Sequence, residues 1–280
     1  MTERRRRPYL IGAVLGALAL AAAPLAGLVR HDATGGPGLT GWYHWMAVRQ
    51  SVTLRSLTVI APPLDDPARA RRGAGHYELV CAACHGSPAA VTARFAADLW
   101  PEPPRLTEAT SRWRPPPRMF QTVKAGVRRS GMPGWPVANR DDEVWDTVAF
   151  LTRLPELSAD DYRRMAGEGS CADCHGPDGR GRDGIPRLDI QTPEYIAAAL
   201  RAYRDGTRAS GTMISVALRL SDARIEEVAR EFGKGLDLSS PVDASDAARI
   251  AAGGVPERDL PACLSCHGPS SPRDYPALLG

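Results

Sequence analysis

The chain has 280 residues, of which 43% are hydrophobic and 24% are charged. This is the composition of a globular protein with two or three small domains, and it excludes a largely disordered chain. The formal net charge of +3 is too small to indicate nucleic-acid binding.

Residues 1–30 predict a membrane anchor or a signal segment. Arginines at positions 4–7 precede residues 9–29, "YLIGAVLGALALAAAPLAGLV", which carry no charge. As a helix this stretch is about 31 Å long, close to a ~30 Å hydrocarbon core. The arginines favour a cytoplasmic N-terminus in a bacterial inner membrane, with the remaining chain in the periplasm. The alternative is a signal peptide cleaved near residues 21–23, which exports the same chain.

Residues 31–64 form a juxtamembrane linker in this prediction. Trp42, Tyr43 and Trp45 lie close to Arg49 and Arg55. Aromatic and basic residues next to an anchor are typical of a membrane interface. A linker packed on the first domain is an equally good interpretation.

The pattern Cys-x-x-Cys-His occurs three times and contains every cysteine of the chain. On a helical turn the two cysteines lie on one face, so both sulfurs can bond to one porphyrin while the histidine binds its iron. A zinc site, a redox dithiol or a local disulfide does not explain why a histidine follows each pair. The sequence therefore predicts three sites for c-type haem, namely Cys81, Cys84 and His85; Cys171, Cys174 and His175; and Cys263, Cys266 and His267.

Two methionines are candidates for the opposite side of the iron. Met132, in "SGMPGWP", and Met213, in "ASGTMIS", lie in segments that read as loops between helices. A loop can bring a thioether to the iron, giving a six-coordinate centre with a raised potential. Met119 and Met165 fall in helical patterns, so core packing or a surface position is the better interpretation for them.

Each haem motif is followed by a Pro-x-Leu triplet, which begins at Pro104, Pro186 and Pro276. A rigid proline turn can offer its carbonyl oxygen to the ring N–H of the ligand histidine. Such a hydrogen bond fixes the tautomer and makes the ligand more basic.

The remaining pattern is helical, and no segment alternates as a strand. Apolar residues at helical spacing predict helices within residues 65–81, 116–127, 141–154, 192–206 and 221–233. Ser158 with Asp161 predicts a capped helix that leads to the second motif. The chain is therefore predicted to be all-α, with haem replacing much of the core that such small units lack.

This order of elements resembles class I cytochrome c. Residues 65–157 resemble the single cytochrome c domain of membrane-anchored bacterial cytochromes, and residues 158–240 and 241–280 resemble the two halves of tandem dihaem cytochromes c. The resemblance implies that Cys81, Cys84, His85 and Met132 serve the first haem, and that Cys171, Cys174, His175 and Met213 serve the second. It assigns Cys263, Cys266 and His267 to a third.

The third domain departs from the family pattern, because no methionine follows Met213 and the chain ends shortly after His267. We therefore expect a partial third domain and a fragment of a longer trihaem protein, or a third haem with another ligand or an open site. His31, His44 and His76 are spare histidines for which a surface position is expected.

The predicted function is a membrane-tethered electron carrier, because no pair of nucleophile and base and no phosphate loop is visible. Donors would be a quinol-oxidising complex or a dehydrogenase, and acceptors a terminal oxidase or a soluble cytochrome. One alternative is the cytochrome subunit of a membrane-bound dehydrogenase. Another is a haem peroxidase that uses an open third site.

Overall fold

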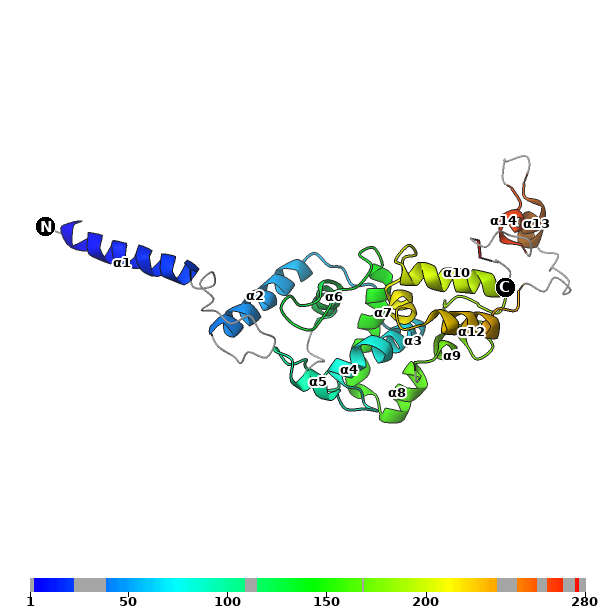
Figure 1. Ribbon diagram of the computed structural model, residues 1–280, viewed down its shortest axis with the longest axis horizontal. Coiled ribbons are helices and arrows are strands. Elements are labelled where there is room, and N and C mark those ends of the chain that lie inside the picture. The colour runs from blue at the N-terminus through cyan, green and yellow to red at the C-terminus, as the bar shows by residue number, and fades with distance from the viewer. Residues whose placement is uncertain are drawn as a thin grey trace.

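The computed structural model describes residues 3–22, 39–108, 115–167, 169–235, 246–255, 261–268 and 275–276. Within these ranges the chain is helical and contains no β-strand, which confirms the predicted all-α class. Figure 1 shows the helices in their order along the chain.

The first half of the chain contains two long helices and the elements around the first haem motif. These are α1 (Glu3–Ala22), α2 (Leu39–Ser56), α3 (Pro67–His76), the π-helical turn η1 (Tyr77–Cys81), α4 (Ala82–His85), α5 (Arg94–Ala97), α6 (Pro116–Ala125), α7 (Asp141–Leu151) and the 3₁₀ turn η3 (Leu154–Glu156). The second half contains α8 (Ala159–Ala166), α9 (Cys171–His175), α10 (Pro193–Arg204), α11 (Gly211–Ala217), α12 (Asp222–Phe232), α13 (Asp246–Gly253) and α14 (Leu264–His267).

Side-chain caps fix where three of the predicted helices begin. A capping oxygen accepts a hydrogen bond from a backbone N–H that has no partner within the first helical turn. Ser158, Thr192 and Ser221 do this for α8, α10 and α12, respectively. The predicted capping of α8 by Ser158 is therefore confirmed.

The first core lies where α3 crosses α7. The two backbones touch, because a Cβ atom on Gly73 would lie only 2.0 Å from the carbonyl oxygen of Asp146. On the other side of α7, the predicted apolar face of Val144, Trp145 and Val148 packs on α6, where Met119 is buried as expected. This crossing brings the segment before the first haem motif against α7, the helix that closes the first unit. The first unit is the predicted domain of residues 65–157, and the second unit is the predicted domain of residues 158–240.

Helix α8 also packs against α3, although the sequence assigned it to the second domain. Tyr162 and Ala166 of α8 lie in one buried cluster with Ala74, Tyr77 and Phe150. The first two units therefore share part of a core, and the boundary at residues 157–158 stays a prediction.

The second core lies between α10 and α12. Ile196, Leu200, Ile225, Val228 and Phe232 form its buried cluster.

Two arginines of α3 connect the first unit to the loop of the second haem motif. The guanidinium of Arg71 binds both carboxylate oxygens of Asp183 at 2.6 Å. Arg72 donates to the backbone carbonyl of Asp183 at 2.5 Å and binds Asp146 of α7. The two haem-motif regions are thus fixed relative to each other by side chains from one helix.

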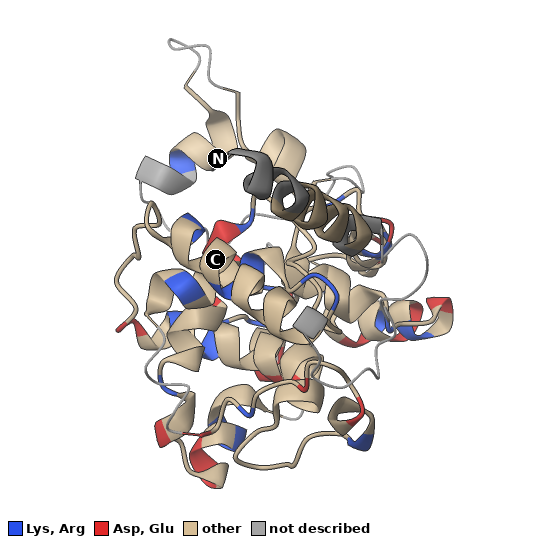
Figure 2. Cartoon of the chain, turned by 90° about the vertical axis from the view of Figure 1, so that its left-hand side faces the viewer, with Lys and Arg blue, Asp and Glu red and all other residues tan. Residues whose placement is uncertain are grey.

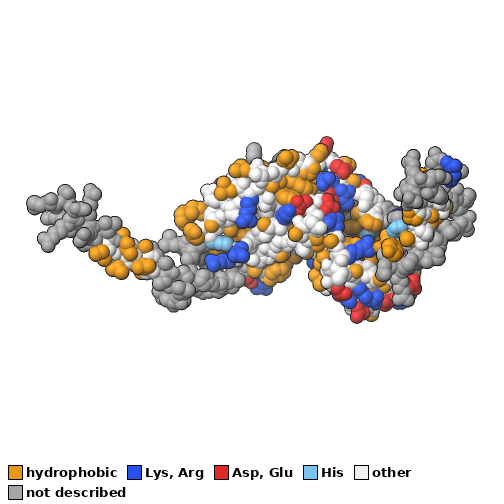
Figure 3. Space-filling view, turned by 90° about the horizontal axis from the view of Figure 1, so that it is seen from above, with side chains coloured by type: hydrophobic (Ala, Val, Ile, Leu, Met, Phe, Trp, Pro, Cys, Tyr) orange, Lys and Arg blue, Asp and Glu red, His pale blue; other side chains and the backbone are white. Residues whose placement is uncertain are grey.

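Helix α2 packs against α6. Val59 and Leu64, which follow it, pack against the cluster that contains Met119. This confirms the interpretation of a linker packed on the first domain. The aromatic side chains of Trp42, Tyr43 and Trp45 remain exposed, and hydrophobic side chains are visible at this end of the helical body in Figure 3.

The predicted inner-membrane anchor is wrong. Among the residues that the structure describes, no helix is both long and apolar enough to cross a membrane. Helix α1 includes the arginines at positions 4–7 and ends at Ala22. The rest of the predicted anchor, residues 23–29, lies outside the described residues, as does His31.

Candidate functional site

The three Cys-x-x-Cys-His motifs lie on three short helices, α4, α9 and α14, and each histidine is the last helical residue. The sequence predicted a continuous helix before the first motif. The structure instead has the π turn η1, which ends at Cys81. Single π turns are frequently found at functional sites because they change the direction in which a side chain points.

Each motif histidine contacts the proline of its own Pro-x-Leu triplet. The Nδ1 atom of His85 lies 2.9 Å from the carbonyl oxygen of Pro104, and that of His175 lies 2.9 Å from the carbonyl oxygen of Pro186. The third motif repeats the contact, with 2.7 Å between Nδ1 of His267 and the carbonyl oxygen of Pro276. The predicted contact between proline and histidine is confirmed at all three motifs.

This contact determines the tautomer of the ring. A carbonyl oxygen can only accept a hydrogen bond, so Nδ1 must carry the proton and donate it. In a neutral ring the lone pair then lies on Nε2, the atom that can bind a metal. Burial lowers the pKa of His175, which keeps its ring neutral. These histidines are thus oriented as metal ligands by their own backbone.

The motif cysteines form no disulfide with one another in the described residues. The four in the first two motifs are half-buried, whereas Cys263 and Cys266 are exposed. Burial raises the pKa of Cys81 to about 12 and also raises the pKa values of Cys171 and Cys174.

An apolar site that disfavours a thiolate is a poor site for a reactive redox dithiol. It is compatible with a thioether sulfur, which carries no charge. Within the described ranges, no cluster of three or more His, Cys, Asp and Glu side chains is arranged to hold a metal ion. The surroundings of these cysteines therefore favour haem attachment over the dithiol alternative.

The two candidate methionines differ in their surroundings. Met132 lies in a loop, as expected, and its amide donates to the hydroxyl of Ser130 at 3.1 Å. Met213 does not lie in a loop. It is in the first turn of α11, which Ser210 caps, and it packs on the same apolar cluster as Cys171. The second motif and its candidate ligand thus share one core, and their roles as ligands stay predictions.

The third motif has only short neighbouring elements in the described residues. Helix α13 contacts α14, and the ring of His267 lies edge-on to Tyr275 with 5.7 Å between the centroids. The leucine of its Pro-x-Leu triplet, Leu278, lies outside the described residues.

His76 is not on the surface, contrary to the expectation for it. Its side chain is 4% exposed and packs against Trp135, with 4.3 Å between the ring centroids and 39° between the ring planes. Burial, with a smaller contribution from the nearby Arg219, lowers its pKa to about 4. Its position at the end of α3 places it in the contact between the first two units. His44 is half-buried.

The first unit reaches the second motif directly. A Cβ atom on Gly75 would lie 2.8 Å from the Sγ atom of Cys174, so α3 runs along a cysteine of the second motif. Arg219, which follows α11, donates to the carbonyl oxygen of Leu79 in η1. The first two motifs are therefore held close to one shared helix.

Sequence reasoning missed the polar residues of this contact. Glu143, a buried carboxylate on α7, joins Trp135 to Ser210 and Gly211 at the beginning of α11. Trp135 lies within the segment "SGMPGWP", three residues after Met132. This proximity to a candidate ligand is the one feature of the sequence that could have indicated a role for Trp135.

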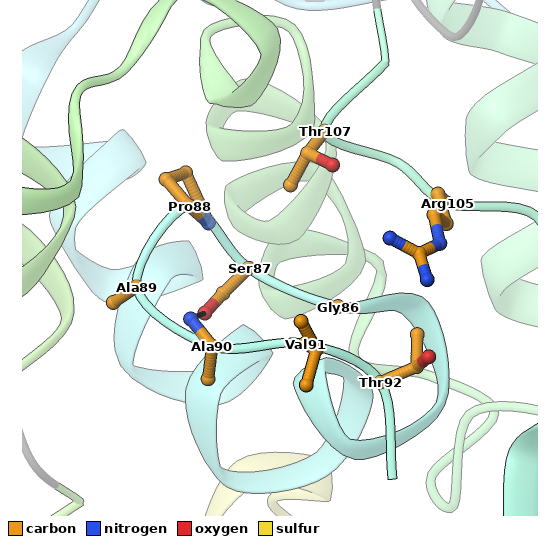
Figure 4. Close-up of a pocket in the computed structure, with 9 residues that line it drawn as sticks. All are labelled: Gly86, Ser87, Pro88, Ala89, Ala90, Val91, Thr92, Arg105 and Thr107. Carbon is orange, nitrogen blue, oxygen red and sulfur yellow. Dashed lines mark hydrogen bonds between the residues drawn. The ribbon is translucent and has the colours of Figure 1, made fainter. Parts of the chain in front are cut away.

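A cavity of about 210 Å³ follows the first motif. Figure 4 shows that the loop 86–92 forms one side of it, with Arg105 and Thr107 on the other. None of the predicted haem ligands lines this cavity, so we do not assign it to a haem.

Charged residues of both signs are mixed over the face shown in Figure 2. This agrees with the small net charge of the chain.

Comparison with known proteins identifies the family. A model of the cytochrome c oxidase, cbb3-type, subunit III family matches residues 68–151. A thiosulfate dehydrogenase electron acceptor of Stutzerimonas stutzeri (strain A1501) is 31% identical over 165 residues, which are 52% of this chain and 72% of that protein. The chain belongs to the class I cytochromes c.

Two further relatives of this cytochrome are similar over shorter spans. A thiosulfate dehydrogenase electron acceptor of Thiomonas intermedia (strain K12) is 34% identical over 122 residues, 40% of this chain and 56% of its own length. Cytochrome c4 of Thiocapsa roseopersicina is 32% identical over 128 residues, 44% of this chain and 66% of its own length. The chain thus spans little more than half the length of the Thiomonas intermedia protein. No solved structure matches it significantly.

Membership of this family confirms part of the predicted chemistry. The cytochromes c carry covalent haem c with iron, and the pairs Cys81/Cys84 and Cys171/Cys174 fit the attachment motif. The relatives are electron-transfer proteins, which confirms the expectation of an electron carrier rather than an enzyme. The number of haems stays a prediction.

Proposed function

We propose that this cytochrome passes single electrons between redox proteins through two complete haem sites and a third attachment site. In the first site Cys81 and Cys84 hold the haem, and His85 and Met132 bind its iron. In the second site Cys171 and Cys174 hold the haem, and His175 and Met213 bind its iron. The third haem is held by Cys263, Cys266 and His267.

The observation that carries this proposal is the repeated contact between histidine and proline. A hydrogen bond from Nδ1 to a proline carbonyl occurs after all three motifs, at 2.7–2.9 Å. Chance packing would not select the same ring nitrogen three times. An orienting bond on Nδ1 is what a ligand that binds through Nε2 requires.

The bound haem supplies an iron that accepts and releases one electron. The chain holds the porphyrin through the cysteines, orients the histidine through the proline carbonyl and surrounds the site with apolar side chains. A histidine–methionine ligand pair and burial both raise the reduction potential. The contact of α3 with Cys174 keeps the first two sites near each other.

Two measurements test the haem assignment. Denaturing mass spectrometry of the exported protein should retain haem covalently, and Cys171→Ala with Cys174→Ala should remove one haem. Met132→Ala and Met213→Ala should each abolish one contribution to the near-infrared charge-transfer band of methionine-ligated haem. A band that survives both methionine changes at full intensity would show that these ligands are wrongly assigned.

We further propose that the electron donor is a dehydrogenase that oxidises a reduced sulfur compound. Two relatives are described as electron acceptors of thiosulfate dehydrogenase. A terminal oxidase or a soluble cytochrome would then be the acceptor. Stopped-flow spectroscopy with a purified thiosulfate dehydrogenase and thiosulfate should show rapid haem reduction, and reduction no faster than with thiosulfate alone would exclude this donor.

A second candidate is a fixed cytochrome subunit of such a dehydrogenase, because a cytochrome subunit of sulfide dehydrogenase from Chlorobaculum tepidum is 39% identical over 64 residues. A carrier and a fixed subunit differ in how long each stays bound to the dehydrogenase. A subunit would elute together with the dehydrogenase in gel filtration, whereas a carrier would separate from it.

A further inference from the structure

A buried carboxylate connects the segments that carry the two candidate methionines. Glu143 lies in the first turn of α7, and its side chain is 10% exposed. Its oxygens accept hydrogen bonds from the indole N–H of Trp135 at 3.2 Å, the hydroxyl of Ser210 at 2.6 Å and the amide of Gly211 at 2.7 Å. Arg140 lies 2.9 Å from the same carboxylate and balances its charge.

On the side of the first haem, Glu143 holds the loop of Met132 through Trp135. The indole ring is fixed on both sides. It packs against the buried ring of His76, and a Cβ atom on Gly211 would lie 2.2 Å from its Nε1 atom. Gly211 therefore allows α11 to approach the indole more closely than a residue with a side chain could.

On the side of the second haem, Glu143 holds the beginning of α11. The hydroxyl of Ser210 donates to the carboxylate and accepts a hydrogen bond from the amide of Met213 at 3.1 Å. Ser210 is 5% exposed, so water does not readily replace either partner. The path from Glu143 to the backbone of Met213 thus consists of two hydrogen bonds, of which the first is buried and the second is partly buried.

We propose that Glu143 is a positioning residue that fixes Met213 at the iron of the second haem and couples this ligand to the loop of the first. This inference rests on the proposed function, in which Met213 is a distal ligand. Met213 lies in the first turn of α11, and α11 has only seven residues. Such a short helix has little stability of its own, so its orientation depends on the groups that hold its beginning.

The coupling has a direction that can be tested. Removing the carboxylate releases the beginning of α11, where Met213 lies, whereas Met132 keeps its own contact with Ser130. The second haem should therefore respond more strongly than the first. A carboxylate that merely stabilised the contact between the two units would lower the stability of the protein and leave the ligand band of the folded protein unchanged.

The experiment compares Glu143→Gln with Asp142→Asn in the haem-loaded protein. The control, Asp142, is the adjacent carboxylate. It is 63% exposed and also pairs with Arg140. It has no hydrogen bond to α11 among those found in the described residues. Both changes are made in a Met132→Ala background, in which the charge-transfer band reports the second haem alone.

We expect Glu143→Gln to weaken or shift this band and to lower the reduction potential of the second haem. Asp142→Asn should leave both unchanged. In a Met213→Ala background, which reports the first haem, Glu143→Gln should have the smaller effect. Glu143→Asp, which is shorter but retains the charge, should recover part of the band.

Two outcomes separate failure of this inference from failure of the proposed function. If Met213→Ala abolishes the band of the second haem but Glu143→Gln leaves its band and potential unchanged, Met213 is a ligand and Glu143 does not position it. If Met213→Ala leaves the band intact, the ligand assignment itself is wrong. If Glu143→Gln does not fold, Trp135→Phe and Ser210→Ala each remove one bond of the same path, and an unchanged band in both overturns the inference.

Discussion

The hydroxyl of Tyr77 donates a hydrogen bond of 2.5 Å to the carbonyl oxygen of Gly86, across the whole first haem motif. Tyr77 begins the π turn before Cys81, and Gly86 follows His85. The tyrosine side chain is fully buried, and burial raises its pKa, so the hydroxyl stays protonated and remains a donor. One side chain thus closes the turn that presents both cysteines and the histidine.

Tyr77→Phe should lower the free energy of unfolding by about 1–3 kcal/mol, because it leaves the carbonyl of Gly86 without this buried donor. Chemical denaturation of the haem-loaded protein measures the change. Tyr43→Phe is the matched control, since Tyr43 is 64% exposed and should lose almost nothing. Equal effects of the two changes would contradict this role of Tyr77.

His76→Phe should reduce the loss of stability on acidification. Burial lowers the pKa of His76 from 6.5 to about 4. The unfolded chain therefore binds a proton between these pH values when the folded chain does not. Above pH 6.5 the ring is neutral in both states and the free energy of unfolding is not affected by its titration. As the pH falls from 6.5 to about 4, the free energy of unfolding decreases by about 3 kcal/mol in total.

Urea denaturation at several pH values between 7 and 4 measures this effect. Phenylalanine retains an aromatic ring against Trp135 but cannot be protonated, so the variant should show a shallower pH dependence than the wild type. The same slope in both proteins would mean that His76 does not titrate in this range.

Helix α8 should be required for the stability of the first unit. Tyr162 is 1% exposed and packs with Tyr77 and Phe150. A haem-loaded fragment of residues 39–167 should be more stable than one of residues 39–157, by about 3 kcal/mol for the buried aromatic side chain alone. Thermal denaturation of both fragments measures the difference, and the fragment 39–167 carrying Tyr162→Ala should behave like the shorter one. Equal midpoints would place α8 entirely with the second unit.

The ion pair of Arg71 and Asp183 should contribute about 0.5–1 kcal/mol to the association of the first two units, because it is bidentate but only partly shielded from solvent. A double-mutant cycle with Arg71→Gln and Asp183→Asn measures it. Asparagine suits this position, since Asp183 has a φ of 55°.

The same pair should weaken in acid. The hydrogen bond from Arg71 lowers the pKa of Asp183. The ion pair therefore contributes to stability in full above the ordinary pKa of an aspartate. This contribution is lost as the pH falls through the lowered pKa that Asp183 has in the folded protein. The exposed pair of Arg224 and Glu227 is the control, with a coupling energy near zero.

The sequence by itself determined the local chemistry. Cysteines and histidine at fixed spacing, and the Pro-x-Leu triplet that follows, predicted the short helices and the orienting contact between proline and histidine. Helices α6, α7, α10 and α12 were predicted from apolar spacing. These features depend on residues that are near one another in the chain, so the pattern of side chains already contains the information.

Only the tertiary structure decided how the units combine. The sharing of α8 between two cores, the burial of His76 and the bonds of Glu143 to α11 join residues that are distant in sequence, and no local pattern indicates them. Burial and ion pairing depend on which surfaces meet, and that is determined by the packing of the whole chain.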